Sequence, residues 1–187
     1  MSLMSRSSTI TAMMRAIRVH KFGGSEVMQL ETSVPIPVIT EDQVLVSVRC
    51  SGVNPVDTYV RSGNYSKLPV LPYTPGKDGS GVVEKLGAAV NNFKVGDRVM
   101  MMTQTGQHGS LAEFMPVDKH NVFPLHENLS FAAGAAVPIP YFTAYRALYL
   151  KGGAKPGHRV LVHGATGGVG QAVVQLAASA GMTVVAT

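Results

Sequence analysis

A glycine-rich segment near the end of the chain has the residue types and spacing that bind a phosphate group. It runs from Gly164 to Gly170 (Gly-Ala-Thr-Gly-Gly-Val-Gly) and directly follows the apolar run Val160–Val162. The run predicts a strand buried on both faces of a parallel sheet, and apolar residues at a spacing of three to four predict a helix over 168–180. Glycines let a backbone approach a pyrophosphate closely, and the start of a helix presents N–H groups and a positive dipole end. The order of strand, glycine turn and helix therefore predicts a dinucleotide site.

The spacing of the glycines departs mildly from the usual fingerprint of such turns. Ala165 stands where the first glycine is usual, and Gly167 and Gly170 follow at the remaining positions. Alanine is compatible with this position if the turn requires no positive φ there. The alternative is a tight turn between strand and helix in some other α/β protein. The residue that distinguishes NAD from NADP is expected about twenty residues further on, where the chain ends.

The elements that would position this turn fall into two groups. From Met14 to about Leu125, short alternating runs separated by glycine and proline predict an all-β part, folded as a small barrel or sandwich. Its predicted strands lie at 15–20, 27–31, 44–48, 79–86, 97–102 and 111–117. Helices are predicted at 131–136, capped by Asn128 or Ser130, and at 141–150. The strand–helix–strand unit then ends with a strand at 183–186.

Composition narrows the class of protein. Hydrophobic residues make up 45% of the 187 residues and charged residues 14%, which favours a sizeable core over global disorder. The single cysteine, Cys50, excludes an internal disulfide and a multi-cysteine zinc site. The net charge of +5 comes from sixteen scattered Lys and Arg with no run of three, so nucleic acid is not expected as the primary ligand.

The beginning of the chain carries weak targeting information. Residues 1–13 are rich in Ser and Thr, contain Arg6 and have no acidic residue. Two interpretations stay open: a disordered leader on a cytoplasmic protein, or a mitochondrial transit peptide. No apolar stretch of the sequence is long enough to span a bilayer, so no membrane partner is expected.

Several motifs, in the same order along the chain, resemble a known family. Residues 54–65 read Asn-Pro-Val-Asp-Thr-Tyr-Val-Arg-Ser-Gly-Asn-Tyr. This resembles the N-P-x-[DE]-x-Y-x-R-x-G-x-Y stretch of zeta-crystallin-type quinone oxidoreductases, in the zinc-independent branch of the medium-chain dehydrogenases/reductases. The other segments that resemble the family are Leu71–Gly76, Gly96–Val99, Ile139–Tyr145 and Val162–Gly170. The likeness extends from about Met14 to Thr187.

The resemblance implies an α/β chain: a GroES-like β-barrel domain followed by the first βαβ unit of a Rossmann domain. The expected division is a leader at 1–13, the β domain at 14–137 and an incomplete NADP-binding domain at 138–187. The implied activity is hydride transfer from NADPH to a small quinone or enone, with a homo-oligomer as the full-length form. The alternative is a truncated, catalytically inactive form that retains the β domain as an interaction or binding module.

The resemblance also assigns roles to individual positions. Asn54 and Tyr59 are the expected catalytic residues, which would supply hydrogen bonds to the cofactor or the acceptor oxygen. The expected cofactor-binding residues are Tyr59, Tyr65, Thr143, Thr166, Gly167, Gly168, Val169 and Gly170. A second interpretation of Asn54 and Asp57 stays open, namely an ordinary turn with a helix cap after Pro55. For Tyr65 the second interpretation is surface packing.

No metal site is expected. In zinc-dependent relatives a catalytic cysteine stands where this chain has Asn54, and a histidine stands where it has Lys77. The six histidines show no ligand spacing. His163, at the end of a predicted strand, is interpreted as a packed or hydrogen-bonded side chain rather than as a base.

Overall fold

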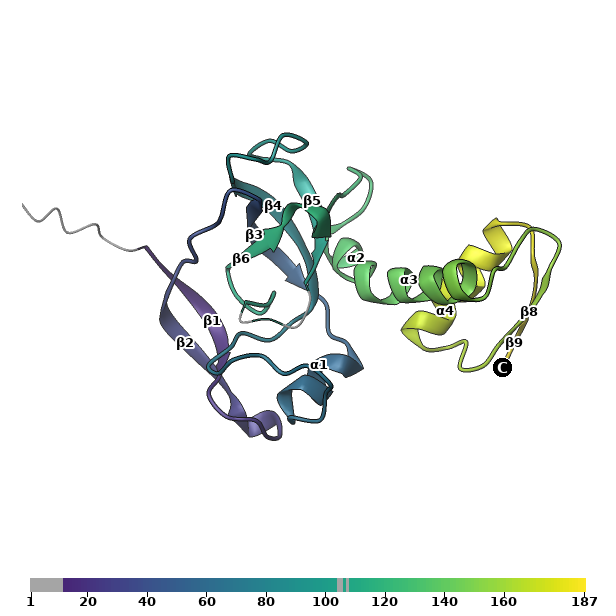
Figure 1. The fold of residues 1–187 in the computed structure, drawn as a ribbon, viewed down its shortest axis with the longest axis horizontal. Helices are drawn as coiled ribbons and strands as arrows, with labels where there is room; N and C mark the ends of the chain where they lie inside the picture. Colours follow the sequence, from purple (N-terminus) through teal and green to yellow (C-terminus); the bar gives the residue numbers. More distant parts are fainter. Residues whose placement is uncertain (1–11, 104–105, 107) are drawn as a thin grey trace, which may run out of the picture.

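The computed structural model describes residues 12–103, 106 and 108–187, which form two lobes (Figure 1). A β lobe contains the chain up to Ser130, and a smaller lobe contains the C-terminal strand–helix–strand unit. Two helices, α2 (Phe131–Ala135) and α3 (Pro138–Tyr145), lead from one lobe to the other. Most of the predicted leader, residues 1–11, lies outside the described residues.

The first two strands form the predicted hairpin. β1 (Met13–Val19) begins at the last residue of the expected leader and pairs antiparallel with β2 (Met28–Pro35). A 3-10 turn at Ser25–Val27 leads into β2. The N–H of Val19 donates to the carbonyl of Tyr73 over 2.9 Å, and the N–H of Tyr73 donates back over 3.1 Å. These bonds join the hairpin to the rest of the β lobe.

A five-stranded antiparallel sheet, in the order β6-β3-β4-β5-β7, forms the centre of the β lobe. Its strands are β3 (Gln43–Ser51), β4 (Asp78–Leu86), β5 (Arg98–Met102), β6 (Phe114–Asp118) and β7 (Val122–Pro124). Successive side chains alternate between the two faces of each strand. The inward face buries a cluster that includes Val46, Met101 and Met115, all with no exposed surface. The sheet and the hairpin together form the small GroES-like barrel that the sequence predicts.

Parts of the β lobe differ from the prediction. Helix α1 (Pro55–Arg61) interrupts the segment expected to be all-β, and it is short enough that its apolar residues show no helical period. Strand β7 has three residues, too few to show the alternation that predicts a strand. Strand β6 begins at Phe114 and not at Leu111, because Ala112 forms only an isolated bridge to the hairpin.

The helix expected to start at Tyr141 begins at Pro138. A proline suits the first turn of a helix because its missing N–H would have no intrahelical partner there and its φ is already helical. After Tyr145 the chain continues as a wider π-helical segment, Arg146–Lys151, and ends at Gly152. Ser130 caps α2 as predicted, since its hydroxyl accepts the N–H of Ala133 over 3.1 Å.

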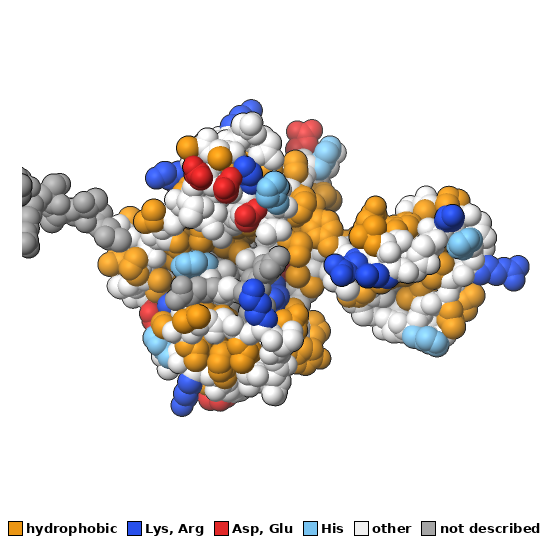
Figure 2. Space-filling model, viewed as in Figure 1, with side chains coloured by type: hydrophobic (Ala, Val, Ile, Leu, Met, Phe, Trp, Pro, Cys, Tyr) orange, Lys and Arg blue, Asp and Glu red, His pale blue; other side chains and the backbone are white. Residues whose placement is uncertain are grey.

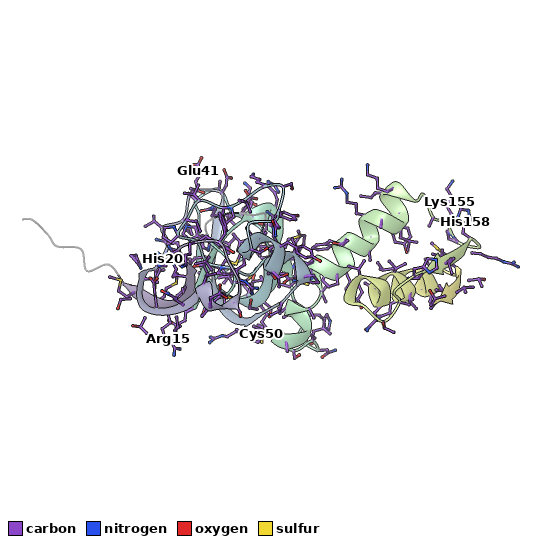
Figure 3. The ribbon with its side chains drawn as sticks, turned by 90° about the horizontal axis from the view of Figure 1, so that it is seen from below. Arg15, His20, Glu41, Cys50, Lys155 and His158 are labelled. Carbon is purple, nitrogen blue, oxygen red and sulfur yellow. The ribbon has the colours of Figure 1, made fainter. Side chains whose placement is uncertain are left out.

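The smaller lobe contains the predicted parallel unit of β8 (Arg159–Val162), α4 (Gly168–Ser179) and β9 (Thr183–Ala186). Its core joins one face of the strands to α4 and to the segment that follows α3. Leu161, on the opposite face, is 58% exposed, so the expectation of a strand buried on both faces is wrong for the described residues. Lys155 and His158 mark the end of this lobe that lies farthest from the hairpin residue Arg15 (Figure 3).

Candidate functional site

The glycine turn lies between β8 and α4, as the sequence predicts. Gly164 carries the positive φ of the turn (+67°), so Ala165 needs none and its departure from the usual fingerprint is accommodated. Gly167 is the N-terminal cap residue of α4, and its carbonyl accepts the N–H of Gln171 over 2.8 Å. A Cβ at Gly170 would lie 2.2 Å from the carbonyl oxygen of Gly164, so only glycine fits where the helix begins. The turn therefore presents bare backbone beside a helix N-terminus.

The smaller lobe, which contains this turn, has a positive formal charge. No Asp or Glu occurs in the sequence after Glu127, whereas Arg146, Lys151, Lys155 and Arg159 all lie in this later part. In Figure 2 the visible acidic side chains accordingly lie on the β lobe, and the smaller lobe shows Lys, Arg and His. A potential of this sign attracts anionic ligands.

A cleft of about 630 Å³ lies between the β lobe and α4, and we call it the interlobe cleft. The polar and thiol side chains that line it, together with Gly168, are Cys50, Ser51, Asn54, Asp78, Tyr141, Gln171 and Gln175. Two residues assigned from the sequence, Asn54 and Gly168, are thus brought to one space. The hydroxyl of Tyr141 donates to Oε1 of Gln175 over 2.7 Å, which ties α3 to α4 along the cleft.

Asn54 is positioned by two carboxylates. Its backbone N–H donates to Oδ2 of Asp57 over 2.9 Å at the start of α1. Its side-chain Nδ2 donates to Oδ1 of Asp78 over 2.8 Å. The interpretation of Asp57 as part of a helix cap after Pro55 is therefore confirmed. Asn54 itself is buried, and these two bonds fix its amide beside the interlobe cleft.

Asp78 joins the two walls of the cleft. Its Oδ2 accepts the backbone N–H of Ile139 over 3.0 Å, at the start of α3, while its Oδ1 accepts the bond from Asn54. The side chain is 1% exposed, and burial raises the pKa of Asp78 to about 6 despite both hydrogen bonds, which favour the ionised form. The charge of Asp57 raises this pKa further. Asp78 is thus a buried carboxylate that titrates close to neutrality.

A second cleft, of about 440 Å³, lies on the other side of α3's first residues, and we call it the Tyr65 cleft. It is lined by Val56, Tyr65, Ser66, Lys67, Lys77, Met102, Thr103, Ile139 and Thr143. Nζ of Lys77 lies 5.4 Å from the centroid of the Tyr65 ring, a distance at which a cation is attracted to the ring face. Two further residues assigned from the sequence, Tyr65 and Thr143, thus share one cleft.

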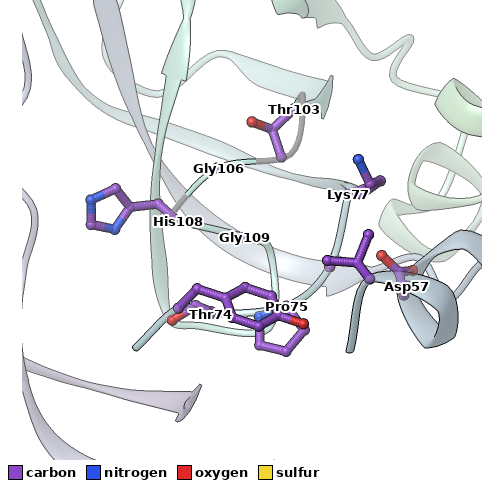
Figure 4. A pocket seen from close by; sticks show the side chains of 11 residues that line it. Asp57, Thr74, Pro75, Lys77, Thr103, Gly106, His108 and Gly109 are labelled. Atoms are coloured by element: carbon purple, nitrogen blue, oxygen red, sulfur yellow. The ribbon is translucent and has the colours of Figure 1, made fainter. Parts of the chain in front are cut away.

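A small cavity of about 20 Å³, enough for one water molecule, adjoins the Tyr65 cleft (Figure 4). Lys77 and Thr103 line both spaces, and Asp57, Tyr73 and His108 complete the ionisable lining. Burial raises the pKa of Asp57 and of Tyr73 and lowers the pKa of Lys77 and of His108. The Tyr73 hydroxyl is buried and finds no hydrogen-bond partner among the described residues.

The remaining assigned residues are not gathered into either cleft. Tyr59 lies on α1 and is 53% exposed, and it lines neither the interlobe cleft nor the Tyr65 cleft. Thr166, Gly167, Val169 and Gly170 lie on the glycine turn and the first turn of α4. His163 hydrogen-bonds through Nδ1 to the hydroxyl of Thr187 over 2.9 Å, in accord with its interpretation as a hydrogen-bonded side chain.

Sequence reasoning missed the residues that bridge distant segments. Lys77 was considered only as the position of a lost zinc ligand, and Asp78, Thr103, Ile139 and Gln175 were not singled out. A carboxylate at the first residue of a strand, followed by small residues and two valines, was the available signal for Asp78, because a buried charge needs partners. Within the described part of the chain, no group of three or more His, Cys, Asp or Glu side chains could hold a metal ion. Of the helices described, none is long and apolar enough to cross a membrane.

Comparison with known proteins finds relatives along nearly the whole chain. A family model described as the alcohol dehydrogenase GroES-like domain matches residues 40–127. Human quinone oxidoreductase is 49% identical over 175 residues, which are 94% of this chain and 53% of the human protein. The chain thus spans about half the length of the curated relatives it matches.

Solved structures give the same result for the fold. The quinone oxidoreductase from Coxiella burnetii superposes with a TM-score of 0.83 and 34% identity, covering 92% of this chain and 56% of that one. Mycobacterial Rv1454c complexed with NADPH superposes with a TM-score of 0.82 and 31% identity, covering 92% of this chain and 52% of that one. With its GroES-like lobe, its glycine turn at the start of α4 and these relatives, the chain belongs to the quinone oxidoreductase family of the medium-chain dehydrogenases/reductases.

Proposed function

We propose that residues 14–137 form the substrate-facing domain, and residues 138–187 the start of the cofactor domain, of an enzyme that transfers hydride from NADPH to a quinone or similar conjugated carbonyl. The observation that carries this proposal is the interlobe cleft, where Asn54 of the β lobe and Gly168 of α4 line one space. Relatives described as quinone oxidoreductases support the reaction, and the neighbour complexed with NADPH supports the cofactor. The proposed reaction is zinc-independent, since Asn54 and Lys77 replace residues that would bind the metal.

The residues of the glycine turn fit the pyrophosphate of such a cofactor. A Cβ at Gly170 would collide with Gly164, so this position requires glycine. Without a side chain there, the backbone of the turn stays accessible to a phosphate. The N–H groups in the first turn of α4 have no intrahelical partners, and the helix dipole is positive at this end. Thr166, Gly167, Gly168 and Val169 would therefore hold the phosphates, in a lobe whose formal charge is positive.

NADPH, when bound, would supply the hydride. The chain's own groups would act on the acceptor carbonyl, whose oxygen gains negative charge as it is reduced. In the Tyr65 cleft, Tyr65 and Thr143, which the resemblance assigns to the cofactor, would face its nicotinamide end and the acceptor, together with the hydroxyl of Thr103. Donors fixed before the reaction stabilise developing negative charge most effectively. Asn54, held by Asp57 and Asp78 at the start of α1, and Tyr59, exposed on the same helix, would supply hydrogen bonds to the cofactor or the acceptor oxygen.

A fluorescence titration of this chain with NADPH tests the proposal. We expect saturable binding by the wild-type chain, and loss of at least tenfold in affinity for Gly170→Ala because its side chain collides with the turn. Ser179→Ala is the control, since Ser179 is exposed in the last turn of α4, at the opposite end of the helix from the glycine turn, and its hydroxyl donates to the carbonyl of Leu176. The proposal fails if the wild-type chain does not bind NADPH, or if Gly170→Ala binds as tightly as Ser179→Ala.

A further inference from the structure

Asp78 makes two hydrogen bonds that its ionised form completes and its neutral form does not. One carboxylate oxygen, Oδ1, accepts from Nδ2 of Asn54, and the other, Oδ2, accepts the backbone N–H of Ile139. Protonation places a hydrogen on one of these oxygens, and an asparagine places an NH2 group there, so one of the two donors would then face another donor. The pair of bonds therefore depends on the charge of Asp78.

The fold holds the Asp78 carboxylate in one position. The backbone carbonyl of Asp78 accepts the N–H of Gly52 over 2.9 Å and the hydroxyl of Ser110 over 2.7 Å. A Cβ at Gly52 would collide with Oδ1 of Asp78, so glycine leaves the space that the carboxylate occupies. From there Asp78 reaches partners on two other elements, Asn54 at the start of α1 and Ile139 in the first turn of α3.

The bond to Asp78 also orients the amide of Asn54. Asn54 is buried, and both residues line the interlobe cleft. The two N–H groups of an amide share one nitrogen, so the bond that directs one of them to Asp78 also fixes the direction of the second. With a neutral Asp78, the amide gains a partner by turning over, which brings its oxygen to Asp78 and moves both N–H groups away. The ionised carboxylate therefore determines where Asn54 can donate.

Few other ionisable groups lie near this pair in the described part of the chain. Of the residues that line the interlobe cleft, Cys50 on β3 and Tyr141 on α3 are the others that can ionise. Helices α2 and α4 contain no ionisable residue, and neither do the last three residues of β5, which pair with the start of β4. The adjacent Lys77 lines the Tyr65 cleft. Burial, and to a smaller extent the charge of Asp57, raises the pKa of Asp78 to about 6, so both of its forms occur near neutral pH.

We propose that Asp78 is a positioning residue: its carboxylate holds the Asn54 amide so that the second N–H donates to a carbonyl oxygen of the bound ligand. The inference rests on the proposed function, which supplies two such oxygens, that of the nicotinamide carboxamide and that of the acceptor. Gly168, at the start of α4, lines the same cleft as Asn54, so a cofactor bound at the glycine turn lies beside this space.

This role sets stability against binding. Ionisation of Asp78 lowers the stability of the folded chain, because burial opposes the charge. The same ionisation prepares Asn54 for the ligand. As the pH rises, Asp78→Asn should therefore gain stability relative to the wild type while it loses affinity relative to the wild type. A purely structural role would move both quantities in the same direction.

NMR of the Asn54 side-chain amide tests the positioning without any ligand. Its NH2 signals are identified by their absence from Asn54→Ala. In the wild type they should shift with the same midpoint as the Asp78 carboxyl carbon, near pH 6, and in Asp78→Asn they should stay constant over this range. Asp42→Asn is the control, because it removes an exposed carboxylate that pairs with Lys119 over 2.7 Å. The Asn54 signals of this control should shift as in the wild type.

Calorimetric titration with three probes measures the effect on binding. The probes are NADP⁺, which is stable in acid, 2′-phospho-ADP-ribose, which lacks the nicotinamide, and the quinone 9,10-anthraquinone-2-sulfonate. At pH 7.5 the wild type should bind NADP⁺ about tenfold more tightly than Asp78→Asn, the factor that one well-placed hydrogen bond produces. At pH 5, where about a tenth of Asp78 is ionised, the ratio should fall to about twofold. Titration of the cofactor phosphate is common to both proteins and cancels in this ratio.

Two comparisons show whether Asp78 acts through Asn54. In Asn54→Ala, the further change Asp78→Asn should cost no affinity, because the amide that Asp78 positions is already absent. 2′-Phospho-ADP-ribose should bind the wild type and Asp78→Asn equally, because it lacks the carboxamide. A pH-dependent loss for NADP⁺ identifies the carboxamide oxygen as the partner of Asn54, and a loss for the quinone identifies the acceptor oxygen.

Specific outcomes would overturn the inference. They are Asn54 signals that do not follow Asp78, an equal loss of affinity for 2′-phospho-ADP-ribose and NADP⁺, or a loss caused by Asp78→Asn in the absence of the Asn54 amide. The NADPH titration described above keeps the two proposals apart. NADPH binding with a constant ratio between wild type and Asp78→Asn for NADP⁺ and for the quinone refutes this inference alone. Asn54 signals that follow Asp78, in a chain that does not bind NADPH, refute the proposed function alone.

Discussion

Asp78 provides a stability test that is independent of any ligand. Burial raises its pKa from 3.8 to about 6, so the folded chain holds the Asp78 proton more tightly than the unfolded chain does. Each pKa unit corresponds to about 1.4 kcal/mol, and the rise therefore represents about 3 kcal/mol. This contribution to stability is fully present below about pH 3.8 and is lost as the pH rises through about 6.

The variant Asp78→Asn isolates this contribution. Asparagine has nearly the shape of a protonated aspartic acid and, like it, offers one carbonyl oxygen to the N–H of Ile139 or to the amide of Asn54. Every other titrating group is common to both proteins and cancels to a first approximation in their difference. Going from pH 3.5 to pH 7.5, the variant should gain about 3 kcal/mol of unfolding free energy relative to the wild type.

Urea unfolding of the two proteins at a series of pH values measures this difference, and NMR titration of the Asp78 carboxyl carbon gives its pKa directly. The sign of the change with pH is the decisive result. A constant difference, or a wild type that gains stability over the variant as the pH rises, would refute the reasoning. It would mean that the hydrogen bonds and the N-terminus of α3 stabilise the carboxylate more than burial destabilises it.

Three smaller predictions concern single contacts, each measured by urea unfolding. Tyr73→Phe should raise the free energy of unfolding by about 1 kcal/mol, because it removes a buried hydroxyl without a described partner; a loss of stability would reveal a partner. Met115→Ala should lower it by about 2–5 kcal/mol through a cavity at the centre of the β lobe, and a loss below 1 kcal/mol would mean the core collapses around it. Ser130→Ala should lower it by about 1 kcal/mol through loss of the α2 cap, whereas Ser130→Asp should retain most of it.

Local sequence patterns predicted the elements whose stabilising contacts are local or periodic. β3 follows from alternation and α4 from apolar residues three to four positions apart, whereas the hairpin and β4 follow from the turn residues that bound them and β8 from a continuous apolar run. Helix α1 was missed because seven residues, among them Val56 and Val60, form too short a run for a helical period. Its start is determined by Pro55 and by the bond between Asp57 and the Asn54 N–H. The sequence offers this helix cap as an alternative to a binding role for Asn54 and Asp57.

The candidate site also has one part that local sequence patterns predict and one part that depends on contacts between distant residues. The glycine turn was predictable because its geometry is a property of consecutive residues, as the fit of Gly170 against Gly164 illustrates. The bond from Ile139 to Asp78 joins residues 61 positions apart, and no local pattern indicates it. The same holds for the approach of Lys77 to the Tyr65 ring, which depends on how α1 and the following loop pack against the start of β4. Sequence could supply the polar residues but not their partners.

The start of β4 links the two clefts physically. Lys77 lines the Tyr65 cleft and the next residue, Asp78, lines the interlobe cleft, as expected where side chains begin to alternate between faces. Asp78 also accepts the N–H of Ile139, and Thr143, one turn further along α3, lines the Tyr65 cleft. A change in the charge of Asp78 therefore acts on the start of α3 as well as on Asn54. Since α3 connects the lobes, the buried carboxylate that lowers stability near neutral pH is also the group that hydrogen-bonds the β lobe, through Asn54, to the start of α3, through Ile139.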